Sequence, residues 1–152
     1  MRKSIKLFFG FLLVISGGLI AFSNEKAEAA TSGWQSVYGV SGCKVRVWTD
    51  YSAYTSSATT IDAYAETNGQ CGRLEYKAFR AQQSESFSSY SSESYSGYFS
   101  ERTPIKSFNL NKWNTPIDMT LDSVYVSLLV YKASDPSKTT LISSLPVIVY
   151  KR

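Results

Sequence analysis

Hydrophobic residues recur at every second position over several short segments of this chain. In the first two segments the alternating hydrophobic residues are Val45, Val47, Ile61, Ala63 and Ala65. Strict alternation over four to eight residues is typical of a strand with one buried face. The connection Asp50–Thr60 is rich in Ser, Thr and Tyr. We therefore expect an antiparallel pair of strands joined by this connection, with the alternating residues on one shared face.

The rest of the chain continues with short strand patterns and turn signals. Further strands are expected at Leu74–Arg80, Thr103–Leu110, Leu121–Tyr131 and Leu141–Tyr150. Asp135–Ser137 contains a proline and is typical of a turn, whereas Pro146 indicates an edge or a bulge in the last strand. No 11-residue window has the periodicity and end signals of an amphipathic helix. The pattern predicts an all-β fold, an antiparallel β-sandwich of about seven or eight short strands, with a small barrel as the alternative.

The first 29 residues have the pattern of a secretory signal peptide. Three basic residues precede the apolar run Leu7–Phe22, and Ala27–Ala29 supplies an A-x-A cleavage site. The run of 16 residues is shorter than the roughly 20 that span a bilayer, so a membrane anchor is the weaker alternative. This long leader resembles those of Gram-positive secreted proteins. We expect a signal peptide at 1–29, a single domain at 30–152, a secreted extracellular protein and no stable membrane insertion.

Removal of this leader changes the composition of the expected mature chain. Residues 30–152 hold 12 basic and 10 acidic residues, scattered singly, so nucleic acid is not an expected partner. Ser and Thr make up 33 of these 123 residues, and Phe, Trp and Tyr make up 18. The expected surface is polar, weakly charged and rich in flat aromatic rings.

Cys43 and Cys71 are the two cysteines of the chain. An exported protein meets an oxidising environment, so we expect a disulfide between them. The spacing of 28 is not that of a redox motif, and without histidine two thiols make only half a zinc site. If the disulfide lies in register with the first strand pair, Val47 faces Thr67 and the turn centres on Ser57.

The segment Ser84–Ser100 has nine Ser and five aromatic residues in 17 positions. We interpret it as a surface loop, because Tyr and Ser mixtures are typical of binding loops. A connection whose rings merely pack on the domain is the plainer alternative, and a membrane-active element a third. A second aromatic platform is expected if exposed tryptophans lie beside the tyrosines of 50–60, although Trp and Tyr are also ordinary cross-strand partners. The candidate binding residues are Trp48, Tyr51, Tyr54, Tyr90, Tyr95, Tyr98 and Trp113.

The chain contains no histidine, which excludes catalysis by Ser-His-Asp or Cys-His groups and metal sites built on imidazole. Carboxylates remain as candidate catalytic groups. Asp118 and Asp122 are expected on one face of a strand, and Glu66 and Glu75 are expected on adjacent strands. We expect no enzyme, no catalytic residue, no cofactor and no metal. The predicted function is a secreted binding protein for a cell-wall or extracellular polysaccharide or a surface protein. The alternatives are an exported, bacteriocin-like or toxin-like antagonist and a small carboxylate-based hydrolase.

Overall fold

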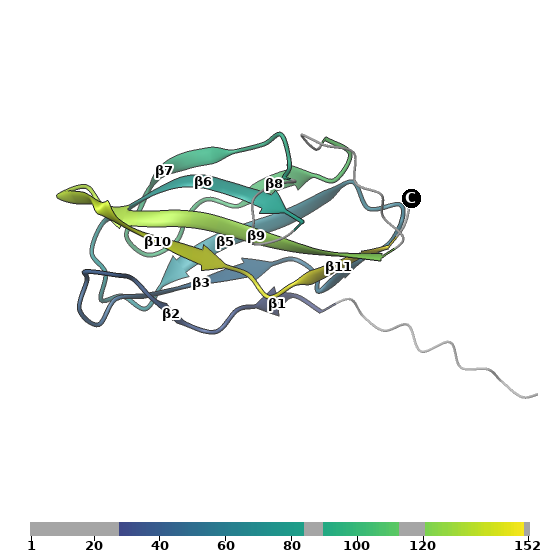
Figure 1. Ribbon diagram of the computed structural model, residues 1–152. Helices are drawn as coiled ribbons and strands as arrows, with labels where there is room; N and C mark the ends of the chain where they lie inside the picture. Colours follow the sequence, from purple (N-terminus) through teal and green to yellow (C-terminus); the bar gives the residue numbers. More distant parts are fainter. Residues whose placement is uncertain (1–27, 84–89, 113–120, 151–152) are drawn as a thin grey trace, which may run out of the picture.

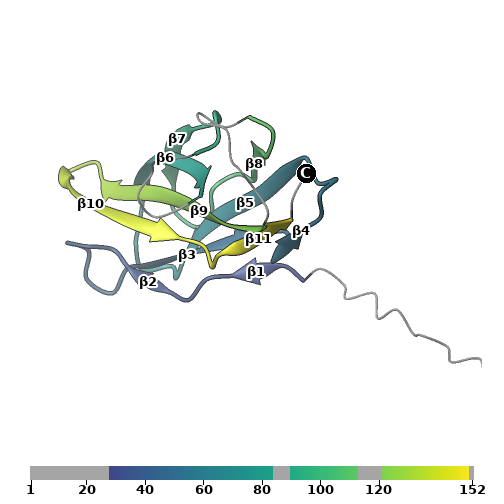
Figure 2. The same cartoon turned by 45° about the vertical axis from the view of Figure 1, so that its right-hand side comes forward.

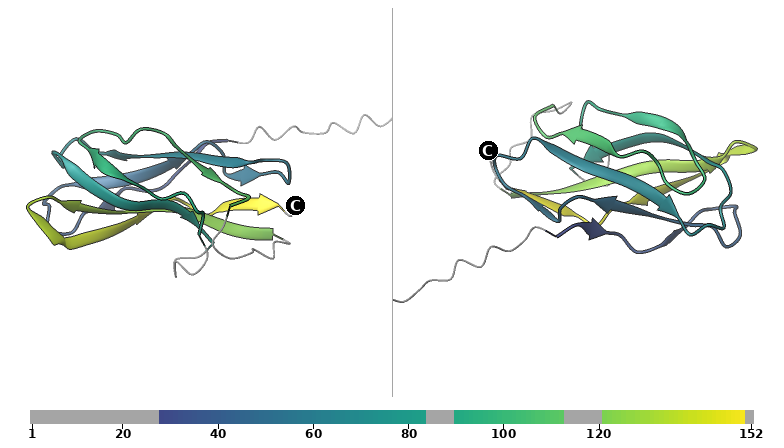
Figure 3. Two further views of the ribbon diagram at one scale, coloured as in Figure 1. Left: turned by 90° about the horizontal axis from the view of Figure 1, so that it is seen from above. Right: turned by 180° about the vertical axis from the view of Figure 1, so that it is seen from behind.

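The computed structural model describes residues 28–83, 90–112 and 121–150. These residues fold into two β-sheets packed face to face, which Figure 3 shows as two layers from above. In the first sheet, β3 pairs with β1, β2 and β5, and β5 also pairs with β8. Its strands are β1 (Ala30–Thr31), β2 (Gln35–Ser36), β3 (Lys44–Thr49), β5 (Thr60–Thr67) and β8 (Lys106–Asn109).

The second sheet has the order β4, β11, β9, β6, β7, with β10 also paired to β9. Its strands are β4 (Ala53–Tyr54), β6 (Leu74–Gln82), β7 (Tyr95–Phe99), β9 (Leu121–Lys132), β10 (Asp135–Ser143) and β11 (Val147–Tyr150). All pairs are antiparallel except β11 with β4, which is parallel. The protein is thus the β-sandwich that the alternation predicts.

Two interrupted strands raise the number of strands above the seven or eight expected. Strands β1 and β2 pair with opposite ends of β3, and β10 and β11 pair with opposite halves of β9. The prediction of one continuous strand over Leu141–Tyr150 is therefore wrong. Pro146 lies in the break between β10 and β11, where its missing N–H removes no ladder hydrogen bond.

The core consists of the side chains that face inward from both sheets. The alternating residues of β3 and β5 are fully buried, as are Val124, Val126, Leu128 and Val130 of β9. On the outer face of β9, Tyr125, Leu129 and Tyr131 are half-buried. These strands bury the faces that the two-residue periodicity of their hydrophobic residues predicts.

The disulfide between Cys43 and Cys71 is present, but the register expected from it is wrong. Val45, and not Val47, lies opposite Thr67, a shift of two residues. The ladder ends where the Asn68 side-chain oxygen accepts a hydrogen bond from the backbone N–H of Lys44 (3.1 Å). The turn at Gly69, with φ of 82°, takes up the extra residues before Cys71 returns to Cys43. The disulfide lies beyond the ladder and so does not set its register.

The turn expected at Asp135–Ser137 lies two residues earlier. Asp135 already pairs with Lys132, so Ala133 and Ser134 form the turn. A bulge between Asp135 and Thr140 accommodates the proline within β10. Local composition identified the hairpin here, whereas the pairing of β9 with β10 determined the turn position.

A glutamine links the two sheets along one edge of the sandwich. The side-chain amide of Gln35 donates to the backbone oxygen of Ser143 (2.6 Å) and accepts from its N–H (3.1 Å). Figures 1 and 2 both show β2 running alongside β10 at this edge. The amide satisfies backbone groups that an open strand edge would expose.

Candidate functional site

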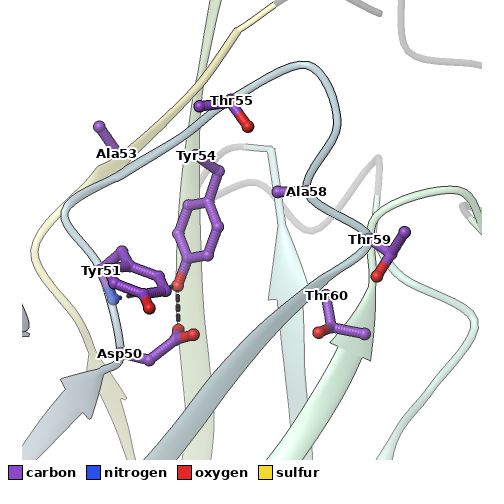
Figure 4. A pocket seen from close by; sticks show the side chains of 8 residues that line it. All are labelled: Asp50, Tyr51, Ala53, Tyr54, Thr55, Ala58, Thr59 and Thr60. Carbon is purple, nitrogen blue, oxygen red and sulfur yellow. Dashed lines mark hydrogen bonds between the residues drawn. The ribbon is translucent and has the colours of Figure 1, made fainter. Parts of the chain in front are cut away.

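The connection between β3 and β5 borders an open hollow of about 520 Å³ at one end of the sandwich. Ligand pockets commonly have volumes of about 300–1,000 Å³. Strand β4 holds this connection in place by pairing with β11. The hollow is lined by Asp50, Tyr51, Ala53, Tyr54, Thr55, Ala58, Thr59 and Thr60 (Figure 4).

Tyr54 forms the buried part of the hollow, with 2% of its surface exposed. Its hydroxyl donates a hydrogen bond to the Asp50 carboxylate, which also accepts from the backbone N–H of Asp62 (3.0 Å). Burial, followed by the hydrogen bond and the negative charge of Asp50, raises the pKa of Tyr54 far above its ordinary value. The hydroxyl therefore stays protonated and holds the connection in one conformation.

Tyr51 places an accessible ring at the same hollow. Its exposed fraction is 44%, and its ring packs edge-to-face on Tyr54 with centroids 5.8 Å apart. Figure 4 shows these two rings on one side of the hollow, with Thr59 and Thr60 on the other. An aromatic ring fixed beside hydroxyls and a carboxylate offers an apolar face and hydrogen-bonding groups together. A sugar ring carries the complementary apolar and hydroxyl groups.

Trp48 does not join Tyr51 and Tyr54 in an aromatic platform. It lies on the outer face of the first sheet, directly opposite Tyr64, with the two rings stacked 4.9 Å apart. The guanidinium of Arg102 lies 4.9 Å from the Tyr64 ring. Trp48 is thus a cross-strand partner, the alternative that its β pattern also allowed. Trp113, the other tryptophan of the expected platform, lies outside the described residues.

The expected loop Ser84–Ser100 contains a strand, so the loop prediction is wrong for Tyr95–Phe99. These residues form β7 at the edge of the second sheet, and 84–89 lie outside the described residues. A Cβ at Gly97 would lie 2.9 Å from the Tyr76 hydroxyl oxygen, so the glycine lets this ring pack against the strand. In the sequence, Gly97 among the aromatic residues of 95–99 is the feature that indicates a close approach of another group to the strand.

The three candidate tyrosines of that segment lie in different surroundings. Tyr95 packs on Phe108 (5.5 Å between centroids), and its hydroxyl donates to the backbone oxygen of Ser107. Tyr98 is 63% exposed and lies beneath a guanidinium. Tyr90 also lies beneath a guanidinium and forms a bridge with Gln82. None of these three tyrosines lines the hollow. The sequence pattern did not single out Asp50 or the threonines that do line it, because Asp and Thr are common in loops.

The candidate carboxylates do not form a catalytic pair among the described residues. Glu66 is on β5 and Glu75 on β6, which lie in different sheets, so the expectation of adjacent strands is wrong. Glu66 forms an ion pair with Arg46 (2.6 Å), and Glu75 lies 3.9 Å from Arg73. Asp118 and the side chain of Asp122 lie outside the described part of the chain.

The described residues also contain no cluster of three metal-ligating side chains. In the same part of the chain, no helix has the length and apolar character needed to cross a membrane.

Residues 27–147 match a protein family described as the YqgA MG2 macroglobulin domain. The chain belongs to this family. One relative is the Cell wall-binding protein YqgA of Bacillus subtilis (strain 168), which is 51% identical over 131 residues. The alignment covers 86% of this chain and 87% of the relative. No solved structure matches the chain.

The YqgA MG2 match extends from before β1 to the first residue of β11. It therefore includes the whole hollow, both cysteines of the disulfide and the complete β6 strand. The similarity therefore applies to the sandwich up to the start of β11 and not to one motif within it.

Proposed function

We propose that this protein is exported and binds the cell wall without catalysing a reaction there. Residues 1–29 are the cleaved signal peptide in this proposal, and 30–152 are the wall-binding domain. Support comes from the relative whose name states cell-wall binding and whose similarity covers 86% of the chain. The Cys43–Cys71 disulfide fits an extracytoplasmic location, because paired cysteines persist in oxidising compartments.

The hollow is the proposed binding site, and its ligand is a sugar unit of a wall polysaccharide. The observation that carries this assignment is the ring of Tyr51, held against Tyr54 and left 44% exposed at the hollow. Because the ring is already fixed, little conformational entropy is lost when a sugar packs on it. The hydroxyls of Thr59 and Thr60 supply hydrogen-bonding groups for the sugar.

Sedimentation with purified cell walls tests this site. We expect Tyr51→Ala to weaken wall binding by at least about tenfold, which is typical of truncating a central aromatic contact. Tyr51→Phe keeps the ring and is expected to retain most of the binding. The control is Tyr38→Ala, which removes a 67% exposed tyrosine from the connection before β3, at the opposite end of that strand.

The outcomes separate the site from the general function. Equal binding by wild type, Tyr51→Ala and Tyr38→Ala would show that the hollow is not the site. Failure of the wild-type protein to sediment with walls would contradict the proposed function itself. Loss of binding after digestion of the wall polysaccharide, but not of wall peptides, is the result expected for a sugar ligand.

A further inference from the structure

The outer face of the second sheet carries a row of cations, each lying over a tyrosine ring. In the described chain, three such pairs occur in the eight residues from Arg73, which directly precedes β6, to Arg80 within β6, whereas proteins average about one per 70–80 residues. The pairs, with distances to the ring centroid, are Arg73 over Tyr98 (3.9 Å), Lys77 over Tyr131 (5.3 Å) and Arg80 over Tyr90 (4.1 Å). We call Arg73, Lys77 and Arg80 the cation row.

A bulge in β6 keeps the cation row on one face. Lys77 and Arg80 are three positions apart, so in a regular strand their side chains would point to opposite faces. The register with β9 shifts between these two residues, and Ala78 has a φ of 51°. This left-handed conformation is unfavourable for a residue with a Cβ, and such conformations concentrate at functional sites. Both side chains thereby lie on the outer face of the second sheet.

The bulge also serves the core, because it turns both Tyr76 and Phe79 inward. Packing alone does not explain why the residues beside them on the outer face are basic. Arg73 and Lys77 are exposed, as expected of side chains that face solvent. The bulge therefore combines a continuous core with a continuous basic surface.

Basic side chains outnumber acidic ones along the cation row. Glu75 is the one carboxylate between the cations on β6; it lies 3.9 Å from Arg73 and forms a hydrogen bond with the Tyr131 hydroxyl. Three cations and one carboxylate leave an excess of two positive charges over residues 73–80. Residues 30–152 as a whole have 12 basic and 10 acidic residues, which is the same excess. The outer surface along β6 thus carries a local excess of positive charge.

The tyrosines orient the cations for binding anions. A ring stacked on a guanidinium occupies its flat face, while the N–H donors point outward in its plane. Because the side chain is already held, less entropy is lost when an anion binds. A cation occupies one face of each ring, which leaves less of the ring surface for stacking on the bases of a nucleic acid.

The spacing indicates a ligand with several anionic groups. Lys77 lies three positions beyond Leu74, the first residue of β6, or about 10 Å along the strand at 3.3 Å per residue, and Arg73 directly precedes Leu74. Each cation is held over a different tyrosine ring, so the cations do not converge on one phosphate or carboxylate. A linear polymer with regularly repeated anionic groups can contact the whole row.

We propose that the outer face of β6 binds a linear polymer whose repeating units carry phosphate or carboxylate groups. This site is separate from the hollow, which lies at the end of the sandwich between β3 and β5. It does not depend on the sugar-binding proposal. The two sites differ in ligand chemistry, one binding neutral hydroxyl-rich rings and the other repeated negative charges.

Titration of the mature protein with sodium polyphosphate and with poly-L-glutamate tests the proposal. We expect binding to at least one polymer, with affinity falling at a slope of about −2 in log–log dependence on salt for three ionic contacts. Arg73→Gln combined with Lys77→Gln is expected to weaken binding at least tenfold. Arg80 is left in place because its side chain is half-buried.

The matched control removes one Arg and one Lys from the first sheet, as Arg102→Gln with Lys44→Gln. Both residues are exposed and neither lines the hollow. This variant has the same net charge as the test variant and is expected to bind within twofold of wild type. Tyr51→Ala is also expected to leave polymer binding unchanged. The experiment therefore distinguishes an error in the sugar-binding proposal for the hollow from an error in the polymer-binding proposal for the cation row.

Three results would overturn the proposal. Equal weakening by the test and control variants would mean that only net charge matters. Absence of binding to both polymers would exclude a polyanion site. Tighter binding to vesicles of anionic phospholipid or to single-stranded DNA than to both polymers would assign the row to a different ligand. Preference for polyphosphate or for polyglutamate identifies the anionic group, and either preference supports the proposal.

Discussion

Tyr54 is the residue on which the geometry of the hollow depends. Its ring packs under Tyr51, and its hydroxyl joins the connection to Asp50 at the end of β3. Removing a buried hydroxyl leaves its partner without one hydrogen bond, which costs about 1–3 kcal/mol. A single oxygen atom therefore fixes the position of the proposed sugar-binding ring.

Substitution of Tyr54 by Phe gives a pH-dependent prediction. The folded pKa is raised above the ordinary 10.0, so the stabilisation is complete below pH 10 and is lost as pH rises above it. We expect Tyr54→Phe to lower the free energy of unfolding by about 1–3 kcal/mol at pH 8, and the deficit to shrink at pH 11. Urea unfolding at both pH values measures this.

Tyr76 and Tyr131 also have raised pKa values, caused first by burial. The Tyr54→Phe variant therefore still loses some stability at alkaline pH, but less than the wild type does. Tyr150→Phe, which removes an exposed hydroxyl, serves as the control. A deficit of the same size at pH 8 and pH 11 would contradict the role given to the Tyr54 hydroxyl.

Individual side-chain directions were predictable, but their neighbours were not. The period of two placed Trp48 on the outer face, where the structure has it. It could not show that the neighbouring ring is Tyr64 and not Tyr51, because that depends on strand register. Likewise, Tyr51 and Tyr54 were identified as candidate residues by type, whereas the hollow between them and the threonines requires the folded connection.

At the scale of elements, the pair β3 and β5 shows how local and long-range information differ. Alternation predicted both strands and their shared buried face. The disulfide was predicted from composition and compartment and is present. The register inferred from the disulfide was wrong, because the turn after Thr67 contains two residues more than a continuous ladder would have. Alternation of hydrophobic residues does not reveal the length of such a turn.

The disulfide gives a prediction at this scale. It closes a loop with a sequence separation of 28, which stabilises the fold by about 3–4 kcal/mol in the chain-entropy model. We expect Cys43→Ala with Cys71→Ala to lower the free energy of unfolding by that amount. Guanidinium unfolding of wild type and variant measures the change, and reduced wild type is the second comparison. Equal stability of all three would contradict a stabilising role for the bridge.

The β6 strand shows a feature that alternation could not predict. Its sequence changes phase between Lys77 and Arg80, which reads as a break in the pattern. The structure accommodates that break with a bulge at Ala78 and keeps the strand intact. Only the two neighbouring strands, β7 and β9, hold both halves in one sheet.

At the scale of the whole molecule, the proposed export of the chain leads to a prediction on its processing. Cleavage after Ala29 would make Ala30 the first residue, and Ala30 already pairs with Thr49 in β1. We expect the protein recovered from culture medium to have the mass of residues 30–152. Ala29→Tyr should accumulate the uncleaved precursor, because the A-x-A site requires small residues. A secreted product that retains residues 1–29 would contradict the assignment.

The sequence by itself determined the fold class, the buried faces of the strands and the disulfide. These properties follow from local rules, since a strand alternates its side chains and a pair of cysteines in an oxidising compartment forms a bridge. The tertiary structure alone decided the register of β3 with β5, the hollow and the cation row. Each of these depends on which distant segments pack together. Strand registers that differ by two residues bury the same face, so alternation cannot distinguish them, whereas the packing of the two sheets selects one.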